Sequence, residues 1–139
     1  MATYNKFYDF SEQLLRGNHD FDNHTFKLML TNGTPVVGNT VKADITEISA
    51  GNGYTAGGAT LALTITEVSG VATLRANEVT FQASGGTIGP FRYAVIYNDT
   101  AAGKPLVAWF DYGQTTLQDT ESIVARFNNT NPGNVFQIS

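Results

Sequence analysis

The stretch Phe91-Arg92-Tyr93-Ala94-Val95-Ile96-Tyr97-Asn98 decides the fold, because it is apolar on both of the faces that a β-strand presents. A strand with only one buried face alternates apolar and polar residues, whereas a strand covered on both sides is apolar throughout. We therefore expect residues 91–98 to lie at the centre of a sheet.

Other short apolar segments extend from this stretch in both directions. They are residues 25–31, 59–68, 71–75, 78–83, 105–112, 121–128 and 135–138. In residues 25–31, apolar positions alternate with Lys27, Met29 and Thr31, which predicts one buried and one exposed face.

Turn-forming residues separate these segments. Examples are residues 32–35, the two-residue hairpin signal Ser69-Gly70 and residues 129–133. About eight short strands without a βαβ alternation are typical of a mainly β fold. We expect an antiparallel β-sandwich or jelly roll with one N-terminal α-helix.

The helix is expected over residues 5–16, which contain neither glycine nor proline and place Phe7, Phe10 and Leu14 at helical spacing. Asn5 can cap its start, and Gly17 follows where a terminating glycine is favoured. The predicted organisation is an N-terminal helix or arm over residues 1–17 and a single β-sandwich domain over residues 18–139.

Composition excludes several classes of protein. The 139 residues carry a net charge of −4, only 14% are charged, and there is no cysteine. An acidic chain is a poor nucleic-acid binder, and a chain without cysteine has neither disulfides nor thiolate metal sites. Residues 1–6 lack the apolar run of a secretory signal, and no apolar stretch is long enough for a membrane span. We therefore expect folding in a cytoplasm and neither a nucleic-acid nor a membrane partner.

Both histidines lie in the segment His19-Asp20-Phe21-Asp22-Asn23-His24, and imidazole with carboxylate can bind zinc or manganese. The calcium-loop pattern fails, because Thr25 stands where glycine is needed and Thr31 where glutamate is needed. Connectors rich in Asn and Asp are commonly turns. We favour a solvated turn and predict no metal site.

The remaining motifs of catalysis are weak. Residues 51–56 fit a relaxed dinucleotide fingerprint, but a β-type segment follows where a helix is required. Lys104 precedes Pro105, so no phosphate-binding loop is formed, and no Gly-x-Ser-x-Gly elbow is present. We predict no enzyme activity, no catalytic residue and no cofactor.

Several stretches together resemble a family of small structural proteins of tailed bacteriophages. They are Tyr4-Asn5-Lys6-Phe7, the segments 26–32, 43–48 and 50–58, and Ser84-Gly85-Gly86-Thr87-Ile88-Gly89-Pro90 with its continuation to Val95. Members of this kind resemble capsid decoration (cement) proteins, which are small, β-rich, often trimeric, and bind the outside of the shell. The resemblance implies the major capsid protein as partner, a homotrimer, and a place on the capsid surface of the virion after folding in the bacterial host cytoplasm.

Two weakly charged segments, the N-terminal helix and the Gly-rich loop, are expected to contact the capsid or neighbouring copies. The expected interface residues are Tyr4, Phe7, Tyr8, Phe10, Gly51, Asn52, Gly53, Tyr54, Gly57 and Gly58. Two alternatives remain open. One is a tail or head-completion component, and the other is a carbohydrate-binding β-sandwich for host attachment that stacks sugars on Trp109 or on exposed tyrosines.

Overall fold

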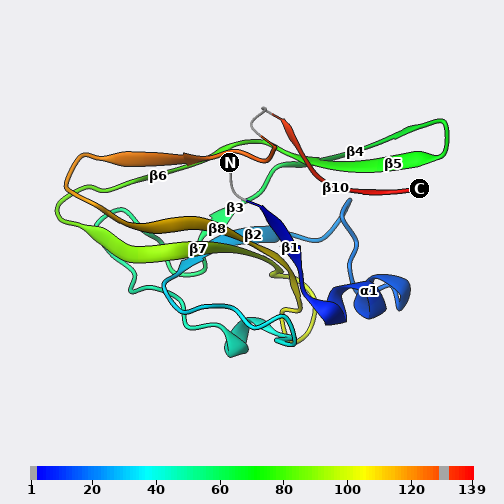
Figure 1. Cartoon of the computed structure of the whole chain (residues 1–139), viewed down its shortest axis with the longest axis horizontal. Helices are drawn as coiled ribbons and strands as arrows, with labels where there is room; N and C mark the ends of the chain where they lie inside the picture. Colours follow the sequence, from blue (N-terminus) through cyan, green and yellow to red (C-terminus); the bar gives the residue numbers. More distant parts are fainter. Residues whose placement is uncertain (1–2, 129–131) are drawn as a thin grey trace.

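The computed structural model describes residues 3–128 and 132–139 (Figure 1). The elements of these residues are β1 (Tyr4–Lys6), α1 (Tyr8–Leu15), β2 (Phe26–Thr31), the short 3-10 helix η1 (Lys42–Asp44), β3 (Ala59–Thr60), β4 (Leu63–Val68), β5 (Val71–Ala76), β6 (Val79–Gln82), β7 (Ile88–Asn98), β8 (Leu106–Leu117), β9 (Ser122–Ala125) and β10 (Gly133–Ile138). The predicted fold class, mainly β with one N-terminal α-helix, is confirmed.

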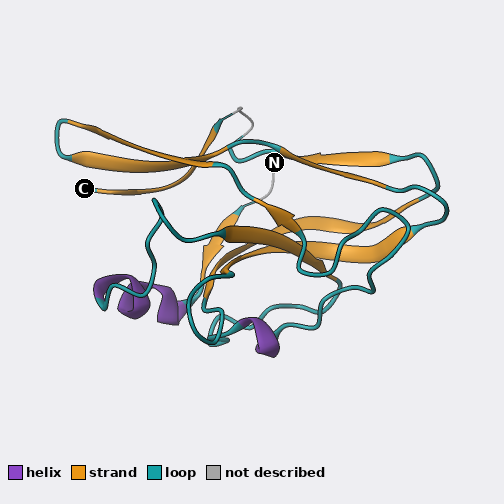
Figure 2. Cartoon of the chain, turned by 180° about the vertical axis from the view of Figure 1, so that it is seen from behind, coloured by secondary structure: helices purple, strands orange, loops and turns teal. Residues whose placement is uncertain are grey.

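The strands form two layers. One layer is a five-stranded antiparallel sheet in the order β1-β8-β7-β2-β3. The other layer consists of the sheet β10-β5-β4 at one end and the pair β6-β9 at the other end (Figure 1). The short helix η1 and much of the long loop between β2 and β3 lie on the opposite side of the five-stranded sheet (Figures 1 and 2). Helix α1 lies at one end of the five-stranded sheet, where its Phe10 ring packs against Phe136 of β10 with ring centroids 5.5 Å apart.

The centre of the five-stranded sheet is β7, as its sequence predicts. Leu30, Ala94 and Phe110 stand opposite one another on β2, β7 and β8 and face the main core between the layers. One residue along, Met29 and Val95 face a second core that is closed by Phe7 and Tyr97. Both faces of β7 are therefore buried from Tyr93 to Asn98, whereas Arg92 stays exposed.

The prediction of a half-exposed strand at residues 25–31 is wrong. Met29 and Thr31, which were expected to face solvent, are both fully buried, and only Lys27 keeps partial exposure. The reason is the second core, because Phe7 and the loop after β2 cover the face that a simple sandwich would leave to water.

The predicted helix start at Asn5 is also wrong. Residues Tyr4–Lys6 are strand β1 and pair with β8, and the Asn5 amide donates to backbone carbonyls rather than capping a helix. Pairing covers the edge of β8, which would otherwise expose its backbone groups. The predicted helix end is confirmed, because Gly17 N–H donates to Leu14 and Asn18 N–H donates to Gln13, at 3.1 and 3.0 Å.

The hairpin at Ser69-Gly70 is confirmed. Both residues have positive φ, 52° and 86°, as a tight two-residue turn requires, and β4 pairs with β5 from Val68↔Val71 onwards. The expected strand over residues 59–68 is instead broken into β3 and β4, which belong to different sheets. This break and the unexpected β1 raise the number of strands among the described residues from about eight to ten. The turn expected over residues 129–133 lies partly outside the described residues.

Substitutions at the neighbouring residues Phe7 and Tyr8 test the second core. Phe7 is fully buried against Trp109, with ring centroids 4.6 Å apart, whereas Tyr8 is 71% exposed. We expect Phe7→Ala to lower the free energy of unfolding by about 3–5 kcal/mol and Tyr8→Ala by less than about 0.5 kcal/mol. Urea unfolding followed by Trp109 fluorescence measures both variants, and equal losses would contradict the second core.

Candidate functional site

The Gly-rich loop between β2 and β3 is the strongest candidate for a functional site, and hydrogen bonds hold its tip in one shape. Gly51 and Tyr54 exchange two backbone hydrogen bonds of 2.8 and 3.0 Å, which close a tight turn. Ser84 N–H donates to the Asn52 carbonyl at 2.8 Å, and the Asn52 side-chain amide donates to the Thr87 carbonyl at 3.0 Å. The exposed tip is therefore fixed to the segment that leads into β7.

Glu47 anchors the base of the same loop. Its carboxylate accepts hydrogen bonds from the Tyr54 hydroxyl at 2.6 Å and from Gly57 N–H at 2.7 Å, and Lys42 lies 3.4 Å away. The Tyr54 hydroxyl in turn accepts from Leu30 N–H at 3.0 Å, which ties the loop to β2. Burial and the neighbouring Glu47 carboxylate raise the pKa of Tyr54 well above its usual range, so this phenol stays protonated as a donor.

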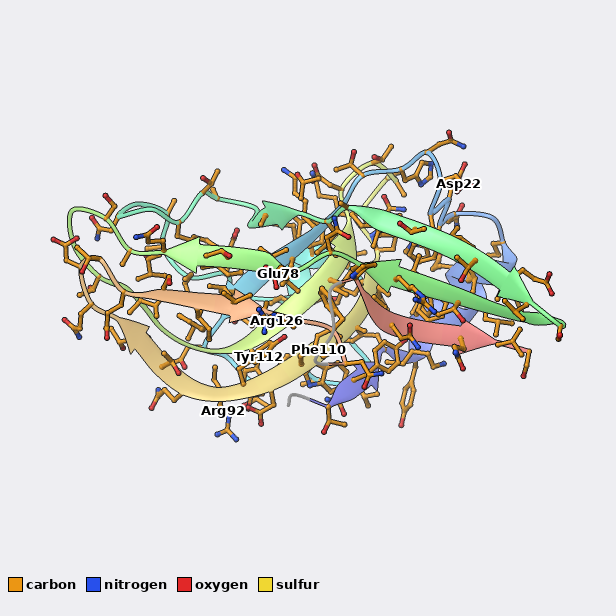
Figure 3. All side chains as sticks on the ribbon, turned by 90° about the horizontal axis from the view of Figure 1, so that it is seen from above. Asp22, Glu78, Arg92, Phe110, Tyr112 and Arg126 are labelled. Carbon is orange, nitrogen blue, oxygen red and sulfur yellow. The ribbon has the colours of Figure 1, made fainter. Side chains whose placement is uncertain are left out.

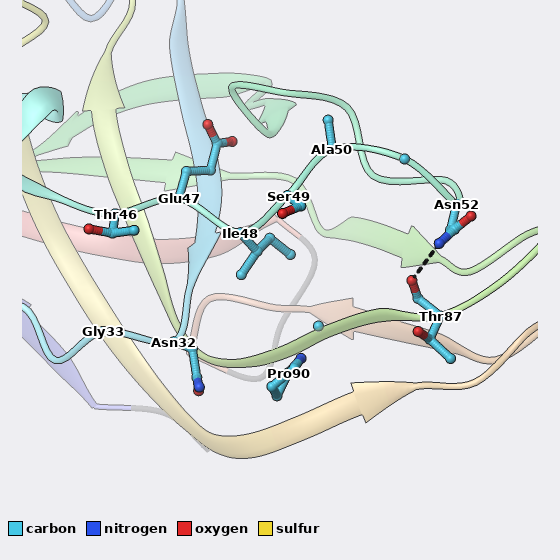
Figure 4. Close-up of a pocket in the computed structure, with 12 residues that line it drawn as sticks. Asn32, Gly33, Thr46, Glu47, Ile48, Ser49, Ala50, Asn52, Thr87 and Pro90 are labelled. Atoms are coloured by element: carbon cyan, nitrogen blue, oxygen red, sulfur yellow. Dashed lines mark hydrogen bonds between the residues drawn. The ribbon is translucent and has the colours of Figure 1, made fainter.

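An open polar groove of about 470 Å³ lies beside the loop (Figure 4). It is lined by Asn32, Gly33, Thr46, Glu47, Ile48, Ser49, Ala50, Gly51, Asn52, Thr87, Gly89 and Pro90. The side-chain polar groups are amides and hydroxyls, apart from Glu47, whose carboxylate is already bonded within the chain. Such a surface can exchange hydrogen bonds with an uncharged protein surface, and the groove offers no cation to an anionic ligand.

The expected interface residues divide into three groups. Tyr8, Gly51, Asn52 and Gly53 are exposed, and Tyr4, Gly57 and Gly58 are half-buried. The expectation is wrong for Phe7, Phe10 and Tyr54, which are 0%, 3% and 3% exposed. Their rings complete the two cores, so they position the helix and the loop and are not presented to a partner.

Trp109, the suggested sugar platform, is half-buried at the second core. Phe7 packs against its ring. This contact gives Trp109 a packing role in the sheet.

The connector before β2 is held by a buried amide. Asn98, at the end of β7, places its side-chain nitrogen 3.2 Å from the Asn18 carbonyl oxygen, 3.3 Å from Nδ1 of His19 and 3.0 Å from Nδ1 of His24. Its oxygen accepts from the backbone N–H groups of Thr100 and Ala101. The two N–H groups of this amide serve the Asn18 carbonyl and the two imidazoles, and these contacts fix the turn that enters β2.

Among the described residues, no group of three or more His, Cys, Asp or Glu side chains is placed to hold a metal ion. Within the same residues, no helix is long and apolar enough to cross a bilayer. No protein-family model matches the chain, and comparisons with curated proteins and with solved structures likewise give no match.

Sequence reasoning missed Glu47 and Asn98. Glu47 is the one acid in the segment Ile45-Thr46-Glu47-Ile48, and a single carboxylate in a segment with two isoleucines is a usable signal for a buried hydrogen-bonding role. Asn98 is the last residue of the predicted strand 91–98, and nothing local indicates that its amide meets two histidines 74 and 79 residues away.

Gly58 tests how closely the loop approaches the sheet. A Cβ at Gly58 would lie 2.1 Å from the Leu28 carbonyl oxygen, whereas a Cβ at Gly70, which has almost the same φ, meets open space. We expect Gly70→Ala to lower the free energy of unfolding by about 1–2 kcal/mol from backbone strain alone. Gly58→Ala should cost more than about 3 kcal/mol, because backbone atoms must also move.

The difference between these two variants is measured by chemical denaturation. Equal stabilities would contradict the close contact of the loop with β2.

His19 makes the fold sensitive to mild acid. Burial, together with the neighbouring His24 and opposed by Asp9, lowers the pKa of His19 to about 4. The unfolded chain takes up the proton near pH 6.5, so stability is complete above that pH and declines as the pH falls toward 4, by up to about 3 kcal/mol. Protonation would also turn Nδ1 into a donor that faces the donating amide of Asn98.

Urea titrations between pH 7.5 and pH 4.5 measure this loss. His19→Phe keeps the ring contacts with Phe10 and Phe21 and removes the titrating group. We expect its stability to vary much less over the same range. A wild-type protein with constant stability would show that His19 is not held neutral.

Proposed function

We propose that the chain is a bacteriophage virion structural protein, a capsid decoration (cement) protein that binds the outer shell and stabilises it. Its partners in this proposal are the major capsid protein and further copies of itself, as a homotrimer on the capsid surface. It acts by binding, without a cofactor and without catalysing a reaction. The proposal begins from the resemblance of the sequence to small structural proteins of tailed phages.

The observation that carries the proposal is the fixed, uncharged loop at residues 51–58. The loop is exposed at its tip and is bonded to the sheet through Glu47, Tyr54 and Asn52. A surface that is already ordered loses little conformational entropy when it docks, and this favours binding through modest interfaces. Many such interfaces on a symmetric shell add up through multivalency.

The loop faces a partner mainly with glycine, asparagine and threonine. These residues let the backbone approach closely and supply hydrogen bonds without a net charge. A docking loop of this kind suits a regular protein lattice better than a small anionic ligand, which a cationic pocket would bind.

Binding to capsids tests the proposal. Purified protein is mixed with capsids of the phage that encodes it, prepared without this protein, and the bound fraction is measured by sedimentation. We expect saturation at a copy number close to that of the major capsid protein. Thr55→Arg places a bulky charge on the exposed loop and should weaken binding about ten-fold, or about 1.4 kcal/mol.

Thr66→Arg makes the same change at an exposed position of β4, in the other strand layer, and should bind as the wild type does. Saturation at a few copies per particle would instead support a tail or head-completion component. No binding of the wild-type protein to the shell would contradict the proposal.

A further inference from the structure

An apolar patch lies between α1 and the sheet β10-β5-β4, and it is defined by Leu14, Leu15, Phe21, Ile65, Phe136 and Ile138. Two adjoining grooves of about 110 and 360 Å³ run along it and share Leu14, Phe136 and Ile138. We propose that this apolar patch is the surface through which one copy of the chain binds another.

The patch follows from strand register. Ile65, Leu74 and Phe136 stand opposite one another on β4, β5 and β10, so their side chains share one face of this sheet. Ile138 lies two residues beyond Phe136 and points to the same side. The sheet extends past the five-stranded sheet, so its outer end has no second layer of strands beneath it (Figures 1 and 2).

Three side chains of the patch are exposed, while Leu14, Phe21 and Phe136 are half-buried against the main core. Leu15, at the end of α1, is 89% exposed, Ile138 is 51% exposed and Ile65 is 46% exposed. Single exposed apolar residues are ordinary, but several of them around connected grooves mark a contact surface. Leu15 projects next to a groove that it does not fill in its own chain, and it is the right kind of side chain to fill the groove of a second copy.

Charge favours a second copy of this chain as the occupant. Neither groove is lined by a carboxylate, although the chain carries 12 acidic and 8 basic residues. Two copies can therefore meet through the patch without bringing acids together. At other positions charged side chains are paired within the chain, as Arg92 is with Asp111. Arg126 is paired with Glu78 in the same way (Figure 3).

The charges that flank the patch have opposite signs. Lys6 lines the groove at the β1 side, and Glu67 lies on β4 two residues beyond Ile65, toward the hairpin tip. When the Lys6 end of one copy meets the Glu67 end of another, opposite charges approach. Reciprocal contact in a dimer forms this pair twice, and head-to-tail contact in a closed ring forms it once for each copy.

This inference rests on the self-association in the proposed function and names the surface for it. Purified protein tests the patch in the absence of capsids. A failure of self-association and a failure of capsid binding are therefore seen in separate experiments.

The test is the mass of the purified protein in solution, measured by sedimentation velocity and light scattering over a range of concentrations. We expect the wild type to form an oligomer. Leu15→Asp and Ile138→Lys should each weaken association at least about ten-fold, because a charge would be buried in the contact.

Val124→Lys is the matched control, since Val124 is an apolar residue with 40% exposure on β9, at the other end of that layer. It should associate as the wild type does. Circular dichroism and Trp109 emission confirm that each variant is folded.

A charge exchange provides an independent readout. Lys6→Glu alone and Glu67→Lys alone should each weaken association, and the double variant should recover most of it. A wild-type protein that stays monomeric at every concentration would overturn the inference. It would also be overturned if folded Leu15→Asp and Ile138→Lys associate as the wild type does, or if Val124→Lys dissociates equally.

Discussion

The burial of β7 on both faces is the constraint on which the rest of the structure depends. A strand that is apolar on both sides must be buried on both faces. In this chain the second layer of strands buries only one face of β7. The other face is buried by Phe7, which follows β1, and by the long loop after β2. The arm and the loop are therefore fixed parts of the fold.

The loop can cover the sheet because a few polar groups bind it there. Glu47 accepts hydrogen bonds from Tyr54 and Gly57, and Tyr97 donates to the Gly57 carbonyl at 2.6 Å. These bonds satisfy polar atoms that burial would otherwise leave without partners. The outcome is a loop whose inner side is bonded to the sheet and whose tip at residues 51–53 stays exposed.

The sequence predicts the strands better than it predicts the surfaces. Residues 91–98 indicate a central strand because a pattern of apolar residues is a local property, and Ser69-Gly70 indicates a hairpin for the same reason. The role of Phe7 could not be predicted from the sequence. Its spacing from Phe10 fits a helix, but the same sequence also fits a short strand that is followed by one core residue. The contacts of Glu47 and Asn98 depend on segments far apart in the chain, and the apolar patch depends on how far one sheet extends past another. A local sequence pattern reports neither these long-range contacts nor the relative extent of the two sheets.

The central claim is that a sheet covered by an ordered loop presents that loop to a capsid shell. Electron cryomicroscopy of intact particles tests it most directly, because the ten strands and the loop at residues 51–58 have a shape that can be fitted to density. We expect copies at regular positions over the outer shell, with this loop facing the capsid lattice. Density for the chain only at the neck or tail, or a loop that points to solvent in every copy, would contradict the claim.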